Sequence, residues 1–352
     1  MDWDSFLHSL AGKRVVLSGC GGGSDVLGTS VIYARIKDTA KEVIFFSLSF
    51  TRDELLQQSC RRISRKCWLV EPHNVALRDD PEEKVYFPEA RMANVTGQPI
   101  YTLSHFASIQ EYTAAYEAAL GYFGRRFFGG HLADVLILCD GGCDVLLTGR
   151  ETGLATPVED MAHLRAVQPL DIPKKFISAL GANVDCAHGV VQEELDSRLE
   201  QMQRSGTMLL SQPIDLDDPA GQYFAELVSR CVPSCSIVQS LVLAAMEGHV
   251  GCFLPPQLAK RISKNKVPLT EQTRTLYLFH LEHVAREVLY LVAKSGHSCS
   301  RHVRTGSSWV FQSSVSHAAT VDRQHTCAQH LCPYPVEFES SDRLKSASTH
   351  LL

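Results

Sequence analysis

Continuous apolar runs alternate with segments of helical period along most of the chain. Four runs are wholly or almost wholly apolar, which is typical of strands that are covered on both faces. These runs are 15–17, 43–48, 67–70 and 135–139. Apolar positions spaced by three and four residues predict helices at 26–38 and 109–120. Because a strand, a helix and a second strand form a right-handed parallel unit, this order predicts an α/β fold.

The second half of the chain continues the same alternation. Residues 176–180 and 275–279 predict strands, and 190–203 predicts a helix. Helical period on both sides of 231–235 predicts two further helices, and a closing helix is expected at 281–294. The elements are therefore expected to form one large α/β domain.

The residue types at two positions predict where a helix begins and where the domain ends. Thr156 and Pro157, followed by Glu159, match the N-cap, first-turn and capping-box preferences, so a helix is expected to begin there. After Lys294 the chain is rich in Ser, His, Thr and Gln without apolar period. We therefore expect residues 1–294 to form a single domain and 295–352 a poorly ordered tail.

One short sequence occurs twice, each time directly after an apolar run. Residues 22–27 (GGSDVL) return almost unchanged at 141–146 (GGCDVL), within two strand–turn–helix units near 15–38 and 134–166. Glycine-rich turns at helix N-termini expose backbone N–H groups that attract anions. Since ligands of open α/β sheets bind beyond the carboxyl ends of neighbouring strands, we expect the two turns to lie side by side and form one site.

The first turn does not match two known phosphate-binding motifs. Ser24 stands where the dinucleotide fingerprint needs its third glycine, and Thr29 stands where a P-loop starting at Gly23 would have its lysine. The alternative is that the glycines only allow close packing and that Asp25 caps a helix. The candidate ligand-binding residues are Gly19, Gly21, Gly22, Gly23, Ser24, Gly141, Gly142, Glu151 and Thr156.

Carboxylates gather around the second turn. Asp140 ends the strand, Asp144 follows the glycines, and Asp25 has the matching place in the first turn. Carboxylate oxygens beside an anion site are what Mg²⁺ or Mn²⁺ requires, so Asp140 and Asp144 are candidate metal ligands. All three aspartates are candidate catalytic residues. The alternative is that Asp140 is a hydrogen-bonded turn residue and that the other carboxylates only cap helices.

Composition excludes several function classes. A formal net charge of −5 over 352 residues gives no field that would gather nucleic acid. No run approaches the roughly 20 apolar residues of a membrane span, and the N-terminus lacks the pattern of a signal peptide. We therefore expect a cytoplasmic protein without nucleic-acid or membrane partners, whose 12 cysteines are mostly reduced.

The order of these motifs resembles a known family. Residues 19–26, 140–144 and 151–160 are similar to landmarks of domain of unknown function 1152, a mainly bacterial and archaeal family. The resemblance covers roughly residues 10–293, and it departs from the family pattern at 186–189. It implies a Rossmann-like open, mostly parallel sheet with helices on both faces, and it implies no particular activity.

Two functional hypotheses remain from the sequence. The first is an enzyme that binds a phosphorylated or otherwise anionic small molecule, such as a nucleotide, for metal-assisted group transfer or hydrolysis. The second is a non-catalytic metabolite sensor or interaction protein in which the same turns bind the ligand. A ligand-binding panel with and without Mg²⁺ separates the two.

Overall fold

The computed structural model describes residues 2–73, 86–127, 131–153, 155, 157–231, 236–288, 303–305 and 308–310. The chain divides into two compact units, Met1–Cys299 and Ser300–Leu352. The described part of the second unit is an antiparallel pair of short strands, β10 (Val303–Thr305) and β11 (Ser308–Val310). The rest of the predicted tail at 295–352 lies outside the described residues.

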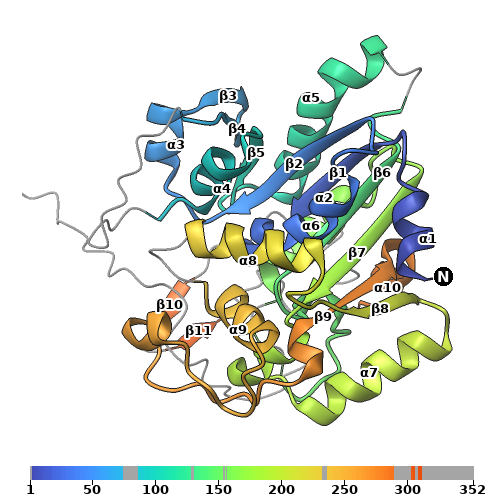
Figure 1. The fold of residues 1–352 in the computed structure, drawn as a ribbon. Helices are drawn as coiled ribbons and strands as arrows, with labels where there is room; N and C mark the ends of the chain where they lie inside the picture. The colour runs from blue at the N-terminus through green and yellow to red at the C-terminus, as the bar shows by residue number, and fades with distance from the viewer. Residues whose placement is uncertain are drawn as a thin grey trace, which may run out of the picture. The chain divides into compact units, whose positions relative to one another are not determined.

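The first unit is built on one nine-stranded sheet with the order β3-β4-β5-β2-β1-β6-β7-β9-β8 (Figure 1). Its strands are β1 (Arg14–Gly19), β2 (Glu42–Ser49), β3 (Arg61–Ser64), β4 (Cys67–Val70), β5 (Ile100–Ser104), β6 (Val135–Asp140), β7 (Lys174–Leu180), β8 (Met208–Pro213) and β9 (Thr275–His280). The five central strands from β5 to β7 are parallel to one another. The outer strands β4, β9 and β8 join by antiparallel pairing.

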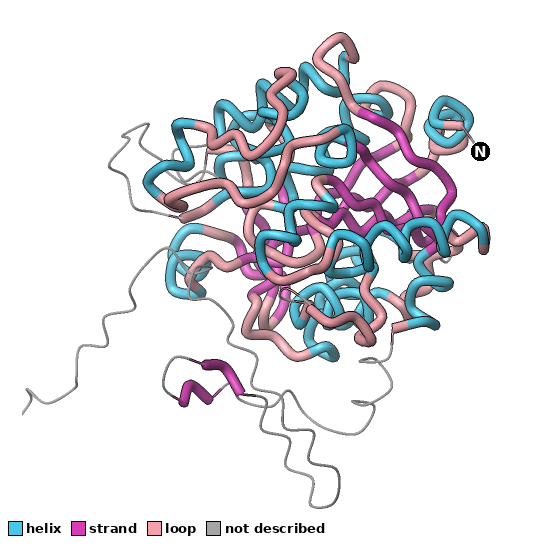
Figure 2. Tube along the Cα trace, turned by 90° about the horizontal axis from the view of Figure 1, so that it is seen from below, coloured by secondary structure: helices cyan, strands magenta, loops and turns pink. Residues whose placement is uncertain are grey.

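Helices and short 3-10 segments connect these strands (Figure 2). The helices are α1 (Trp3–His8), α2 (Ser30–Ile36), α3 (Asp53–Ser59), α4 (Pro88–Thr96), α5 (Ile109–Phe127), α6 (Val158–Val167), α7 (Gln192–Arg204), α8 (Pro219–Cys231), α9 (Ile237–Met246) and α10 (Leu281–Glu287). The 3-10 segments are η1 (Asp25–Thr29), η2 (Asp144–Leu146), η3 (Ala182–His188), η4 (Pro256–Lys260) and η5 (Glu271–Arg274).

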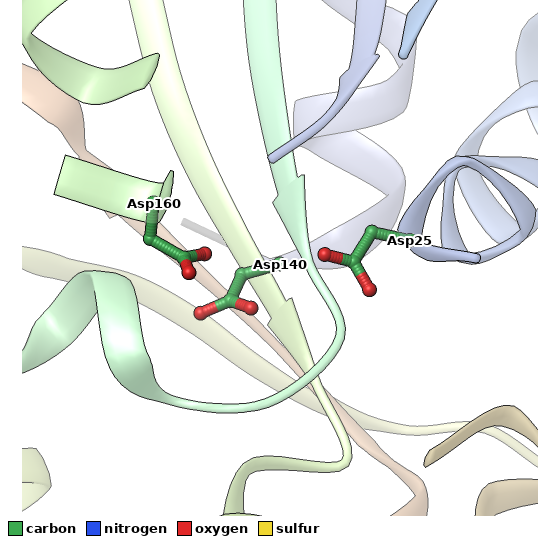
Figure 3. Close-up of side chains that lie close together, drawn as sticks. All are labelled: Asp25, Asp140 and Asp160. Carbon is green, nitrogen blue, oxygen red and sulfur yellow. The ribbon is translucent and has the colours of Figure 1, made fainter. Parts of the chain in front are cut away.

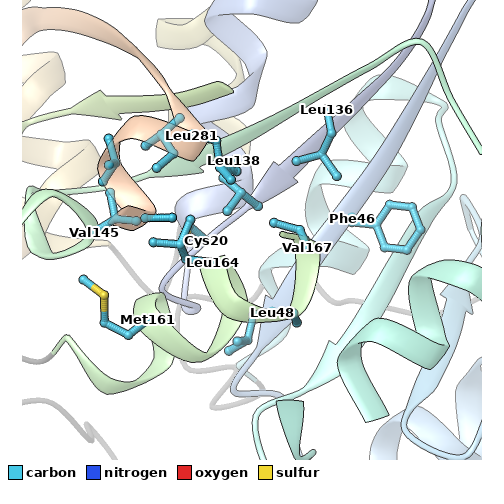
Figure 4. Packing of buried hydrophobic residues seen from close by; sticks show 14 of the residues in the cluster. Cys20, Phe46, Leu48, Leu136, Leu138, Val145, Met161, Leu164, Val167 and Leu281 are labelled. Atoms are coloured by element: carbon cyan, nitrogen blue, oxygen red, sulfur yellow. The ribbon is translucent and has the colours of Figure 1, made fainter. Parts of the chain in front are cut away.

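Alternate residues of the central strands supply two apolar cores, one on each face of the sheet. Val16 and Leu136 join a core with residues of α5, α6, α7 and α10, part of which is drawn in Figure 4. Val15 and Ile137 join the other core with residues of α1, α2, α4 and α8. Successive strand side chains point to opposite faces, so an uninterrupted apolar run has partners on both.

The predicted fold class is confirmed: the sheet is open, parallel at its centre and covered by helices on both faces. The sequence analysis missed several elements, namely α3, β3, α4, β5 and β8. It also began α6 one residue early, because the helix starts at Val158 and Pro157 is its N-cap. None of the described helices combines the length and apolar character needed to cross a bilayer.

Candidate functional site

The two glycine turns lie next to each other at the carboxyl edge of the sheet. Strands β1 and β6 are parallel neighbours, and the last pair in their register is Gly19 with Cys139. The chain leaves β1 towards β2 on one side and leaves β6 towards β7 on the other. The turns therefore stand where the strand order reverses, which is the usual ligand site of open α/β sheets.

Three carboxyl groups converge at this point. Asp25 is the first residue of η1, Asp140 is the last residue of β6, and Asp160 belongs to the first turn of α6. One oxygen from each lies within 4.8 Å of the other two. In Figure 3 the side chain of Asp140 lies between the other two. These three residues are called the acidic cluster below.

Proximity and burial raise the pKa values of all three carboxyl groups. Burial and then the charge of Asp185 raise the pKa of Asp140 to about 7, although hydrogen bonds from the Val145 amide and from Asp160 lower it. Burial and then the charge of Asp140 raise the pKa of Asp160 well above its usual range. The Asp25 pKa is also raised well above its usual range, by loss of hydration and then by Asp140.

No Lys or Arg of the described chain pairs with the acidic cluster. Asp140 and Asp160 are only 6% and 3% exposed, whereas Asp25 is half-buried. Asp160 Oδ1 has no hydrogen-bond partner among the described residues. Buried carboxylates without a counter-charge are costly, so the cluster needs either protons or a cation.

Two glycines make room for these carboxyl groups. A Cβ on Gly21 would stand 2.5 Å from both carboxyl oxygens of Asp160, and one on Gly141 would stand 2.4 Å from Asp25 Oδ1. The backbone N–H groups of Gly141 and Gly21 donate to Asp25 and lower its pKa. The turns thus direct amides at a carboxylate of the protein itself, as a phosphate cradle would direct them at a ligand.

A buried amide lies beside the cluster. Gln239, on the first turn of α9, is fully buried, and neither its Oε1 nor its Nε2 has a hydrogen-bond partner in the described part of the chain. Its Nε2 lies 3.1 Å from the Cβ position of Gly141 that Asp25 also approaches. Because an unpaired buried amide costs about 1–3 kcal/mol, its place beside Asp25 needs an explanation such as a ligand.

Two more aspartates flank the cluster. Asp185 Oδ2 accepts a hydrogen bond of 2.7 Å from the Cys143 amide, and its carboxyl group fills the place of a Cβ on Gly142. Its pKa is raised by burial. Asp144 is 6% exposed, and its charge contributes to the raised pKa of Asp160. The predicted metal pair was Asp140 and Asp144. The three carboxyl groups with oxygens within 4.8 Å of one another are those of Asp25, Asp140 and Asp160.

A chain of hydrogen bonds holds α6 against the first glycine turn. His163 Nδ1 donates to the Cys20 carbonyl at 2.9 Å, so Nε2 accepts from the Tyr116 hydroxyl at 2.6 Å. Tyr116 in turn accepts from Ser18 Oγ at 2.6 Å. Burial lowers the pKa of His163 to about 4, which keeps the ring neutral. Asp160 lies one turn before His163, so this chain helps to place it.

Other predicted residues have different roles. Glu151 accepts four hydrogen bonds within its own loop, from the Thr148 amide and hydroxyl and from the amides of Gly149 and Arg150. Burial raises its pKa, but these bonds outweigh burial and the net pKa is lowered. Thr156 lies outside the described residues.

The remaining predicted residues belong to the first glycine turn. A Cβ on Gly19 would stand 2.5 Å from the Val26 amide nitrogen. A glycine is therefore needed here because the backbone at Val26 packs directly against the end of β1. Ser24 is buried and shares a hydrogen bond with Tyr86. The Cβ positions of Gly22 and Gly23 face Phe50 and the Tyr86 hydroxyl. The carboxyl groups of the acidic cluster are not among these contacts.

The sequence analysis did not select Asp160, Asp185 or Gln239. Asp160 is a first-turn carboxylate, which a capping role explains equally well. For Asp185 a signal was available, because a glycine precedes it by four positions after β7, as Gly21 precedes Asp25 after β1. Gln239 carries no local signal, since only the packing of α9 brings it to the site.

Comparison with known proteins gives one match. Residues 16–301 match the model of the family described as Protein of unknown function (DUF1152). The chain belongs to this family. The DUF1152 match runs from β1 past α10 and includes every residue of the acidic cluster together with Gln239. Comparisons with curated proteins and with solved structures give no match.

Proposed function

We propose that this DUF1152 protein binds a divalent cation, Mg²⁺ or Mn²⁺, through Asp25, Asp140 and Asp160. The observation that carries the proposal is the convergence of one oxygen from each residue within 4.8 Å, with Asp160 Oδ1 buried and unpartnered among the described residues. Hard cations prefer carboxylate oxygens. A bound cation would offset both the burial and the mutual repulsion that raise the three pKa values.

The cation would in turn hold the anionic group of a small molecule, such as a phosphate, for group transfer or hydrolysis. The amides of Gly21 and Gly141 already donate to Asp25, so they are not free to hold that group directly. Without a cation, the acidic cluster would repel an anion. The cation must therefore bind before the anionic ligand can bind. A bound cation would polarise a phosphoryl oxygen of the ligand.

Thermal unfolding of the metal-free protein and its Asp160→Asn variant tests the cation site. In the wild-type protein, Mn²⁺ at about 100 times its Kd should raise Tm by about 5 °C. In Asp160→Asn, the metal-free Tm should rise because the folded protein no longer has to keep this buried, crowded carboxyl group protonated. The response to Mn²⁺ should disappear. A purely structural role for Asp160 would instead lower the metal-free Tm.

Asp171→Asn is the matched control. It makes the same Asp-to-Asn replacement at a side chain that is 68% exposed and that precedes β7 at the opposite edge of the sheet. Its response to Mn²⁺ should equal that of the wild-type protein. A wild-type Tm that ignores Mn²⁺, or a response that survives in Asp160→Asn, would refute the cation site. The same samples should bind pyrophosphate only when Mn²⁺ is present.

A further inference from the structure

Three aromatic rings stand on the carboxyl edge beside the acidic cluster. Phe50 directly follows β2, and His105 and Phe106 directly follow β5. The register of these neighbouring parallel strands ends with Ser49 opposite Ser104, so the rings lie together. Along the edge, the order of the strands is β5, β2, β1 and β6 (Figure 1). Phe50 at the end of β2 is therefore next to the first glycine turn, and His105 and Phe106 lie one strand further out. The three residues are called the aromatic shelf.

Contacts with β2 hold the shelf in place without a ligand. The centroid of the His105 ring lies 5.1 Å from that of Phe50, edge to face, and 3.8 Å from that of Phe106. Both the backbone amide and Nδ1 of His105 donate to the Ser49 carbonyl, at 3.1 and 2.9 Å. A preformed surface binds a ligand without the entropic cost of ordering side chains.

The two phenylalanines of the shelf are exposed although they are apolar. Phe50 is 40% exposed and Phe106 is 67% exposed. They are the only exposed Phe or Trp residues among those whose side chains the structure describes. Single exposed apolar residues are ordinary, but two neighbouring aromatic rings beside a polar site are typical of a binding surface.

One loop joins the shelf to the acidic cluster. A Cβ on Gly22 would stand 2.9 Å from Phe50 Cζ, and one on the preceding Gly21 would stand 2.5 Å from the carboxyl oxygens of Asp160. Adjacent residues of the turn thus face the aromatic ring and the carboxylate. A ligand at the switch point can reach both, because ligands of such sheets lie across the loops of neighbouring strands.

We propose that the aromatic shelf stacks a planar heterocycle of the molecule whose anionic group the cation holds, so that the ligand is a nucleoside phosphate. This inference rests on the proposed cation site. Apolar planar faces match a heterocycle, and the acidic cluster with its cation matches the phosphate. Any base can stack on an aromatic side chain. We therefore expect the shelf to require a planar ring in the ligand but not to distinguish one base from another.

Calorimetric titration of the full chain with ADP and with pyrophosphate, each in the presence and absence of Mn²⁺, tests the shelf. Phe106→Ala should weaken ADP binding between about 5-fold and about 150-fold, the range that stacking provides. It should leave the Kd of pyrophosphate unchanged, because pyrophosphate has no ring. Phe106→Trp should keep the affinity for ADP. Val250→Ala is the control, since Val250 is an 80% exposed apolar residue that follows α9.

The outcomes separate the two proposals. Equal Kd values for ADP in the wild-type protein and in Phe106→Ala would overturn the shelf and leave the cation site standing. ADP binding that is independent of Mn²⁺ but lost in Phe106→Ala would support stacking on the shelf and overturn the claim that the cation holds the ligand. A wild-type protein that binds Mn²⁺ and pyrophosphate but not ADP would also overturn the shelf.

Discussion

The two glycine turns share a sequence but face different neighbours. In the turn after β6, the Cβ positions of Gly141 and Gly142 are occupied by carboxyl groups. In the turn after β1, the matching positions of Gly22 and Gly23 face Leu48, Phe50 and Tyr86. The cause is sheet order, because β1 lies beside β2 whereas β6 lies beside β7. The repeated sequence gives both turns glycines at matching positions, whereas the neighbouring loops determine which side chains face those glycines.

The aspartates of the two turns differ in the same way. Asp25 reaches across to the Gly141 amide, whereas its counterpart Asp144 is not part of the acidic cluster. The second turn contributes Asp140 instead, and the first turn has Gly21 at that position. The side chain that Gly21 lacks leaves the space that Asp160 fills. Three carboxyl groups from non-equivalent positions therefore make one cluster.

The largest effect is expected from Gly141→Ala, which adds a methyl group where the carboxyl group of Asp25 lies. The backbone there is not left-handed, so Gly141→Ala acts only through a methyl group 2.4 Å from Asp25 Oδ1. We expect displacement of Asp25, complete loss of Mn²⁺ binding, and a loss of about 1–3 kcal/mol in the free energy of unfolding. Calorimetric Mn²⁺ titration and urea unfolding measure the two effects.

Gly28→Ala is the matched control for that substitution. A Cβ on Gly28 would have Gln239 Nε2 as its nearest neighbour at 3.8 Å, which is ordinary contact, and Gly28 has no positive φ. Mn²⁺ binding should survive in this variant. If Gly141→Ala also kept its affinity for Mn²⁺, the contact between Asp25 and the second turn would have no part in the site.

A second test contrasts the acidic cluster with a solitary carboxyl group on the side of β2. Glu89 is fully buried, and burial raises its pKa to about 7 although hydrogen bonds from the hydroxyls of Ser47 and Thr51 oppose this. Between pH 4.5 and pH 7, the folded protein keeps a proton that the unfolded chain releases, so stability falls as pH rises. A shift from 4.5 to about 7 corresponds to about 3 kcal/mol.

Glu89→Gln removes this titration and retains an amide that the same hydroxyls can reach. The difference in unfolding free energy between variant and wild-type protein should therefore change by about 3 kcal/mol in favour of the variant from pH 4.5 to pH 8. Urea unfolding across that range measures it, with and without Mn²⁺. The change should not depend on Mn²⁺, and a dependence would show that Glu89 is coupled to the acidic cluster.

The sequence predicted β1, β2, β6 and β7 because these strands are largely apolar runs, and β1 and β6 end at recognisable glycine turns. It missed β5 because Thr102 and Ser104 are polar yet fully buried, and hydrophobic pattern cannot detect buried polar residues. It missed β8 because this half-buried strand ends in Pro213 and has no period. For the site, the sequence selected Asp25 and Asp140, which flank recognisable turns. It could not select Gln239, which tertiary packing alone brings there.

The smallest expected effect concerns Asp144, the residue that the repeat makes equivalent to Asp25. Because it acts on the cluster through its charge and supplies no oxygen to it, Asp144→Asn should weaken Mn²⁺ binding by about tenfold, or about 1.4 kcal/mol. Asp140→Asn should abolish binding, since it removes one of the three converging groups. Calorimetric titration of both variants gives the comparison directly. Equal losses would mean that the two turns contribute equivalent aspartates, and the asymmetry between them would have to be abandoned.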